Sequence, residues 1–175
     1  MTSPTAVNIF DGHNDLAYKL WQRGDRKGTA FLNENESALS ITAQKAADGG
    51  LQAGLFALFV PQPRRDLDTS SAPQQAYAFE TACQMAAILN QLSDDHPDDF
   101  QVCRSAPEID AAKDAGALAA VLHLEGAEPV SPALTELDSF YAMGSDPSAR
   151  SGHARMLSAL VCPSAFRAAL IRELA

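Results

Sequence analysis

The sequence predicts an α/β fold in which helices cover a parallel sheet. Short apolar segments alternate along the chain with longer amphipathic ones, and this alternation of strand and helix is typical of parallel sheets. Residues 51–60 are almost continuously apolar, as expected for a strand that is buried on both faces. The composition agrees, because 46% hydrophobic and 20% charged residues in a chain of 175 are ordinary for a globular domain.

Four segments are expected to form strands. The first, residues 6–10, is a β-branched and aromatic run that ends at Asp11-Gly12, a pair typical of turns. The second, residues 51–60, is closed by two prolines. The remaining expected strands are residues 100–103 and 118–124.

Apolar residues at spacings of three and four predict helices between these strands. Residues 40–47 form one helix, which ends at Gly49-Gly50 in the manner of a glycine cap. A longer helix begins around residues 70–73, where two serines and an early proline occur, and it ends near Ser93. The other expected helices are residues 16–23, 107–115 and 131–143, and polar connections are expected at residues 24–35 and 94–99.

Charge and cysteine content narrow the function classes. The chain has 13 Lys and Arg against 22 Asp and Glu, a net charge of -9, so nucleic acid and anionic membranes are poor partners. It has no apolar run near the roughly 20 residues that cross a bilayer, and its first residues lack the pattern of a signal peptide. Three cysteines without a C-x-x-C pair suit a reducing compartment. We therefore expect a cytoplasmic protein.

Ionisable residues follow two of the expected strands, at the carboxyl edge where parallel α/β folds place their functional groups. His13 and Asp15 are two residues apart, so in an extended segment both side chains lie on one face and can bind one divalent metal. Glu125 leaves the strand 118–124, and His123 points the same way. Each has a simpler alternative: the segment around His13 is also a plain turn, His123 a hydrogen-bonded core histidine and Glu125 a solvated acid.

Taken together, these segments resemble the zinc membrane-type (renal) dipeptidases, the peptidase family M19 of the metal-dependent amidohydrolases. The resemblance covers about residues 7–144. Most other amidohydrolases open with H-x-H, so the acid at position 15 favours the dipeptidases. Four motifs carry it in the family's order: D-[GT]-H-x-D at 11–15, G-G-V-x-x-Q-F-x-x-x-Y-V-P at 49–61, G-x-E-G at 123–126 and L-x-x-F-Y-x-L-G at 137–144.

The resemblance implies a (β/α)8 barrel with two zinc ions and dipeptides as substrates. His13 and Asp15 would hold one zinc, and Glu125 would bridge both, which makes it the catalytic residue that positions the attacking water. Asp11 and His123 would lie beside these ligands and support them. The motifs of the familiar competing hydrolases and nucleotide-binding folds, such as H-E-x-x-H and G-x-S-x-G, do not occur.

The family also uses two histidines and an aspartate from later strands, and its chains are about twice as long. After Glu125 this sequence contains one histidine, His153. We therefore expect residues 1–144 to form a truncated barrel of roughly the first four βα units. It would hold at most one zinc and would show no appreciable dipeptidase activity. The strand 118–124 would have an unpaired apolar edge, which predicts self-association.

Residues 145–175 are expected to be a tail foreign to the family. Their Ala, Arg, Ser and Leu content is typical of GC-rich DNA read out of register, which predicts a reading-frame shift near Gly144. An amphipathic helix at the end of the chain is the alternative. Two other functions also stay open: a non-catalytic remnant or interaction module, and an unrelated doubly wound domain that binds a small molecule near Asp11.

Overall fold

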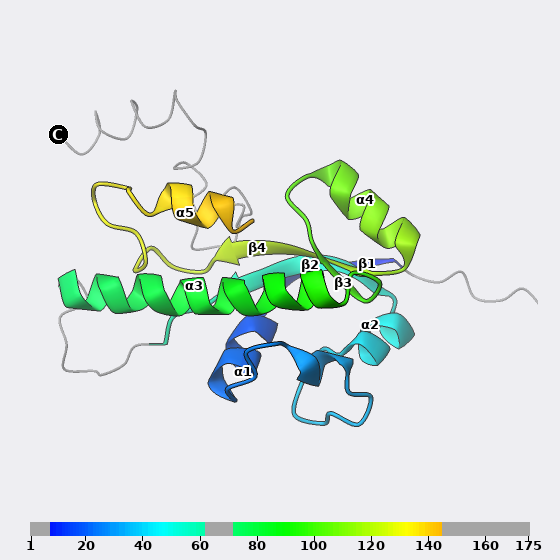
Figure 1. Ribbon diagram of the computed structural model, residues 1–175. Helices are drawn as coiled ribbons and strands as arrows, with labels where there is room; N and C mark the ends of the chain where they lie inside the picture. Colours follow the sequence, from blue (N-terminus) through cyan, green and yellow to red (C-terminus); the bar gives the residue numbers. More distant parts are fainter. Residues whose placement is uncertain (1–7, 62–71, 145–175) are drawn as a thin grey trace, which may run out of the picture.

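The computed structural model describes residues 8–61 and 72–144, which form a four-stranded sheet covered by helices (Figure 1). The strands are β1 (Ile9–Asn14), β2 (Leu51–Leu58), β3 (Phe100–Val102) and β4 (Leu118–Leu124). Every pair of neighbouring strands is parallel, so all four carboxyl ends lie at one edge of the sheet. The predicted α/β class with a parallel sheet is confirmed.

The order of the strands differs from the expected one. It is β1-β2-β4-β3, so β4 lies between two neighbours and the expectation of a wholly unpaired edge there is wrong. All seven residues of β4 are buried, and all but His123 are apolar. Such a strand suits a central position, whereas β3 has only three residues. Because β3 pairs with Leu118–Ala120 alone, the described chain leaves the second half of β4 unpaired on that side. Self-association stays a prediction.

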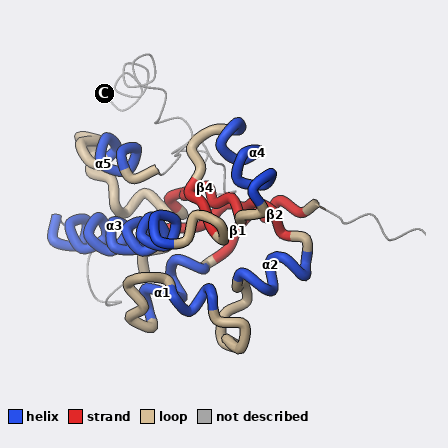
Figure 2. The backbone as a smooth tube through the Cα atoms, turned by 45° about the vertical axis from the view of Figure 1, so that its right-hand side comes forward, coloured by secondary structure: helices blue, strands red, loops and turns tan. Residues whose placement is uncertain are grey.

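Helices lie on both faces of the sheet. Helices α1 (Leu16–Gln22) and α2 (Ala43–Gly49) lie on one side of it in Figures 1 and 2, and α4 (Ala106–Ala115) lies on the other. The short α5 (Leu137–Ala142) follows β4, and its Phe140 packs edge-to-face on Phe79. The long α3 (Ala72–Asp95) runs beside the sheet and packs on the larger core. That core includes Phe56, Leu58, Met85, Leu89, Leu92 and Leu122. A smaller cluster beneath α4 joins Ala53, Cys103, Ala112 and Ala119. No described helix is long and apolar enough to cross a membrane.

Two elements differ most from the predicted ones, while the bounds of others, such as α2 at Ala43–Gly49 against the predicted 40–47, differ by up to three residues. β1 runs through Asp11-Gly12 to Asn14, because pairing with β2 continues past the turn-like pair. The helix expected at 131–143 begins only at Leu137. Before it, Leu134 has a φ of 60°, which no right-handed helix accommodates, and the Glu136 carboxylate accepts hydrogen bonds from the backbone N–H and hydroxyl of Ser131. The tail predicted at 145–175 lies outside the described residues.

Close contact between β1 and β2 depends on Gly54. It pairs with Asp11, and a Cβ placed on it would lie 3.0 Å from the Asp11 Cβ and 3.2 Å from the Asp11 carbonyl oxygen. A side chain at position 54 would therefore require β1 to move away by a few tenths of an ångström.

We predict that Gly54→Ala lowers the free energy of unfolding by about 1–3 kcal/mol, because the added methyl pushes β1 away from β2. Gly49→Ala is the matched control, since nothing lies within 4 Å of its Cβ position and it ends a helix. That change should leave stability unaltered or raise it by up to about 1 kcal/mol. Urea denaturation of both variants tests this, and equal effects would refute it.

His123 is a fully buried polar residue within β4, and neither of its ring nitrogens has a hydrogen-bond partner in the described structure. Burial, together with the nearby His13, lowers the pKa of its imidazole from the ordinary value of 6.5 to about 4. The folded chain therefore holds this ring neutral at a pH where the unfolded chain protonates it.

Because the folded pKa lies below the unfolded one, the contribution of His123 to stability is complete above pH 6.5 and is lost as the pH falls toward 4. We expect a decline of up to about 3 kcal/mol in the metal-free chain. His123→Leu should flatten this part of the stability profile, measured by urea denaturation between pH 4 and 7. His96→Asn, a change in the turn after α3, should keep the wild-type slope. A decline of the same size in His123→Leu would rule out His123 as its source.

Candidate metal centre

The carboxyl edge of the sheet positions the candidate residues. His13 lies near the end of β1, Asp15 follows that strand directly, and Glu125 follows β4. β2 lies between β1 and β4 and is paired with both, so the ends of β1 and β4 are only two strand spacings apart. Residues far apart in the sequence therefore reach one another across the carboxyl end of β2.

An irregularity in β1 accompanies this arrangement. Asp11 pairs with Gly54 and Asn14 with Phe56, so three steps along β1 match two steps along β2. One extra residue is thus accommodated near Gly12 and His13, which is a bulge of the kind that re-aims a side chain. The Asp11 carboxylate accepts a hydrogen bond of 3.1 Å from the His13 backbone N–H across this bulge.

The three predicted ligands meet. The His13 Nε2 lies 3.6 Å from the Asp15 Oδ1 and 3.7 Å from the Glu125 Oε2, and one ligand atom from each residue lies within 4.8 Å of the others. His13 and Asp15 are exposed, while Glu125 is half-buried and its Oε2 has no hydrogen-bond partner in the described structure. The predicted convergence is confirmed, whereas the role of these residues as metal ligands stays a prediction.

His123 lies beneath this group. Its ring packs edge-to-face on that of His13, with the centroids 5.5 Å apart, and its strand partner on β2 is the small Ala57. The predicted place of His123, inside the sheet and close to the same edge, is therefore confirmed. Its ring nitrogens do not belong to the group of atoms that share the 4.8 Å range.

A cavity of about 370 Å³ is lined by two of the three residues, His13 and Asp15. Its walls come from the end of β1, the first turn of α1 and the segment before α2, and the lining includes Asp11, Lys19, Leu39, Ser40 and Ile41. A larger cavity of about 500 Å³ lies at the opposite edge of the sheet, next to Gly50, Gln52 and Leu118. Of these two cavities, the smaller one is lined by His13 and Asp15, at the edge where parallel α/β folds bind their substrates.

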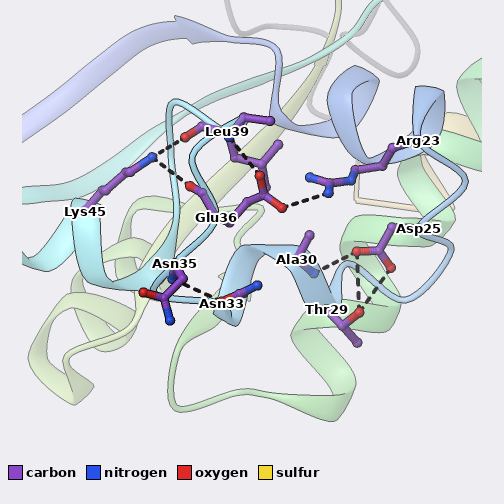
Figure 3. Close-up of polar contacts among 10 residues, drawn as sticks. Arg23, Asp25, Thr29, Ala30, Asn33, Asn35, Glu36, Leu39 and Lys45 are labelled. Atoms are coloured by element: carbon purple, nitrogen blue, oxygen red, sulfur yellow. Dashed lines mark hydrogen bonds and ion pairs between the residues drawn. The ribbon is translucent and has the colours of Figure 1, made fainter.

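Polar contacts hold the segment that forms one wall of this cavity (Figure 3). The Arg23 guanidinium donates a hydrogen bond of 2.7 Å to the Glu36 carboxylate, and this contact lowers the pKa of Glu36. The Lys45 ammonium donates to the backbone carbonyls of Glu36 and Leu39. The connection at 24–35, expected to be merely polar, also contains a short 3-10 helix, Thr29–Leu32. Its N–H at Ala30 donates to the Asp25 carboxylate at 2.7 Å.

Sequence reasoning missed two residues that shape the site. Asn14 is buried and bonds to both β2 and the start of α1. Gly54 leaves room for Asp11. Gly54 lies within residues 49–61, which were already visible as a family motif. Nothing in the sequence shows which residue of β1 faces Gly54. For Asn14, the only available signal was its place between two predicted ligands.

Comparisons with known proteins agree with this geometry. Residues 4–146 match the model of the membrane dipeptidase family, peptidase family M19. A metallopeptidase from Rhodobacter sphaeroides, solved with a phosphinate mimic of the dipeptide L-Ala-D-Ala, is 25% identical with a TM-score of 0.68, over 81% of this chain and 44% of that one. Dipeptidase AC, a metallopeptidase of family M19, is 25% identical with a TM-score of 0.66, over 80% of this chain and 43% of its own.

Two further relatives are an uncharacterized protein and a probable dipeptidase of lower sequence identity. An uncharacterized protein of Acinetobacter calcoaceticus, from the PQQ-III 3' region, is 26% identical over 151 residues, which are 81% of this chain and 47% of that protein. The probable dipeptidase PvdM of Pseudomonas aeruginosa shares the fold, with 19% identity and a TM-score of 0.62, over 79% of this chain and 33% of its own. The chain thus spans about half the length of these relatives or less.

The family match extends over most of the chain, which excludes the alternative of an unrelated doubly wound domain. Two relatives named as metallopeptidases are 25% identical to it over about four fifths of its length and share its fold over that length. The chain belongs to the membrane dipeptidase family, peptidase family M19.

Proposed function

We propose that this chain carries the first metal-binding half of a zinc-dependent dipeptidase site. The observation that carries the proposal is the meeting of His13, Asp15 and Glu125 at the carboxyl edge of a parallel sheet, in a chain of family M19. The sheet would be part of a (β/α)8 barrel, whose active sites lie at this edge. The similarity to two metallopeptidases, one of them solved with a mimic of a dipeptide, supports a metal and a dipeptide substrate, and the chemistry of the three side chains supports zinc.

The donor set fits a zinc ion. One imidazole nitrogen and two carboxylate oxygens lie close enough to surround a single cation, and zinc takes these ligands in tetrahedral sites with one position left for solvent or substrate. The unpartnered Glu125 Oε2 is a buried oxygen whose desolvation a cation would offset. A bound zinc would supply Lewis-acid polarisation of a carbonyl and a water of lowered pKa.

Within this proposal, each side chain has a distinct task. His13 and Asp15 would hold the ion from the β1 side, and Glu125 would hold it from the β4 side and orient the attacking water. Asp11 restrains the His13 backbone through its hydrogen bond, and the ring of His123 limits the rotation of the His13 imidazole. The dipeptide would enter from the adjoining cavity, where Lys19 offers the one cationic side chain among its lining residues.

The described residues offer donors for one zinc rather than two. Beyond Glu125 the sequence supplies only His153 as a further imidazole, whereas a second ion bridged by Glu125 needs more nitrogen donors. The 175-residue chain would therefore bind zinc without completing a two-metal site. A reading-frame shift as the origin of residues 145–175 stays a prediction that the gene sequence decides.

We predict that the purified chain binds zinc with a stoichiometry near one, measured by titration calorimetry after chelator treatment. Glu125→Gln should weaken binding roughly tenfold or more, because it removes an anionic ligand. Glu128→Gln changes an exposed acid three residues along and should leave the affinity within about twofold. Equal affinities of Glu125→Gln and wild type would contradict the assigned ligand.

The 175-residue chain is expected to show no appreciable hydrolysis of L-Ala-D-Ala, even with added zinc, since one held ion leaves the two-metal site incomplete. Release of alanine would be followed with and without zinc. Hydrolysis in the zinc-loaded wild type that disappears in Glu125→Gln would show that the proposed inactivity is wrong, while leaving the metal site intact.

A further inference from the structure

Asn14 is the last residue of β1 and lies between His13 and Asp15. Unlike these two neighbours, its side chain is buried. Its exposed fraction is 8%, whereas the residues on either side are exposed. Both ends of its amide are used. The Nδ2 donates a hydrogen bond of 3.2 Å to the Leu55 carbonyl of β2, and the Oδ1 accepts one of 3.2 Å from the Leu16 N–H.

These two bonds add to the backbone pairing of β1 with β2 and connect the end of β1 to the start of α1. The first spans from β1 to β2 at the point where the bulge disturbs their register. The second is an Asx turn that reaches the first residue of α1, and the N-cap residue Asp15 forms no side-chain cap of its own. The Asp15 side chain is therefore left free for another ligand. Asn14 fixes the backbone on both sides of Asp15 and immediately after His13.

The chemistry of the bridge selects an amide of this length. Aspartate has the acceptor for the Leu16 N–H but no donor for the Leu55 carbonyl, and serine has the acceptor but is too short for the second bond. The Cβ position of Gly54 lies 3.6 Å from the Asn14 Nδ2, an ordinary van der Waals contact, so the amide packs directly against this part of β2.

We infer that Asn14 is the positioning residue of the metal site: its buried amide clamps the β1 bulge to β2 and to α1, and thereby aims His13 and Asp15 at one ion. The inference rests on the proposed function, because it concerns the ligands assigned there. Supporting residues of this kind around metal ligands typically change metal affinity by about 10–100-fold when they are removed.

The test compares Asn14→Ala with Asn90→Ala in the full chain. Asn90 is a matched control, because its Nδ2 also bridges two elements through backbone carbonyls, Ala86 of α3 at 2.9 Å and Met143 after α5 at 2.8 Å, and it contacts no candidate ligand. Zinc affinity by titration calorimetry and thermal unfolding of the metal-free chain are measured for both. Asn14→Ala should lose about tenfold or more in zinc affinity, and Asn90→Ala less than about twofold at a similar loss of stability.

Equal affinity losses in the two variants, or none in Asn14→Ala while wild type binds zinc, would overturn the inference and leave the proposed function standing. If Asn14→Ala does not fold, Asn14→Ser supplies the comparison, since its hydroxyl can still accept from the Leu16 N–H but cannot reach Leu55.

A second measurement needs no metal and separates the two claims if wild type fails to bind zinc. In amide NMR spectra of the metal-free chain, Asn14→Ala should speed hydrogen exchange of the Leu16 N–H and shift the His13 and Asp15 resonances, and Asn90→Ala should do neither. Unchanged exchange at Leu16 and unshifted resonances in Asn14→Ala would overturn the positioning role by themselves.

Discussion

The parallel pairing of β2 with both β1 and β4 is the constraint on which the rest of this structure depends. It places the carboxyl ends of three strands side by side, and so brings His13 and Asp15 from one end of the described chain within reach of Glu125 near the other. The middle strand contributes no metal ligand. Instead, β2 has small residues where its neighbours have larger polar ones. Gly54 is paired with Asp11 and Ala57 with His123, so the larger side chains of β1 and β4 have room above β2.

This arrangement has an energetic cost at the same edge. His123 and the Glu125 Oε2 are buried polar groups without partners in the described structure, and such groups lower stability unless something bonds to them. Packing in the apolar core on the opposite face of the sheet offsets this loss of stability. Phe56 and Phe31 both meet Phe100 edge-to-face, with centroids 5.4 Å apart, and the apolar face of α3 packs against the same strands. Functional sites commonly concentrate unsatisfied groups that the surrounding fold must hold in place.

The local rules of the sequence were accurate where the chain's own chemistry decides the outcome. Helix α2 is closed by the predicted glycine pair, where Gly50 has a φ of 71°, and α4 at Ala106–Ala115 begins within one residue of its predicted start. β4 has the predicted bounds, because an unbroken apolar run ended by Glu125-Gly126 suits a buried strand. The same rules were wrong for Asp11-Gly12, where a turn-like pair lies inside β1, and for residues 131–136, where the turn closed by Glu136 replaces helix.

The sequence by itself determined the α/β class, the family and the identity of the three candidate ligands, because each rests on residue types in a fixed local order. Tertiary structure alone decided that β4 lies between β2 and β3, that β1 contains a bulge and that Asn14 joins β1 to β2 and α1. The physical reason is that strand order and register follow from which apolar faces can be buried together and which backbone groups then need partners. Those partners, such as the Leu55 carbonyl for Asn14, lie far away along the chain, where no local pattern reveals them.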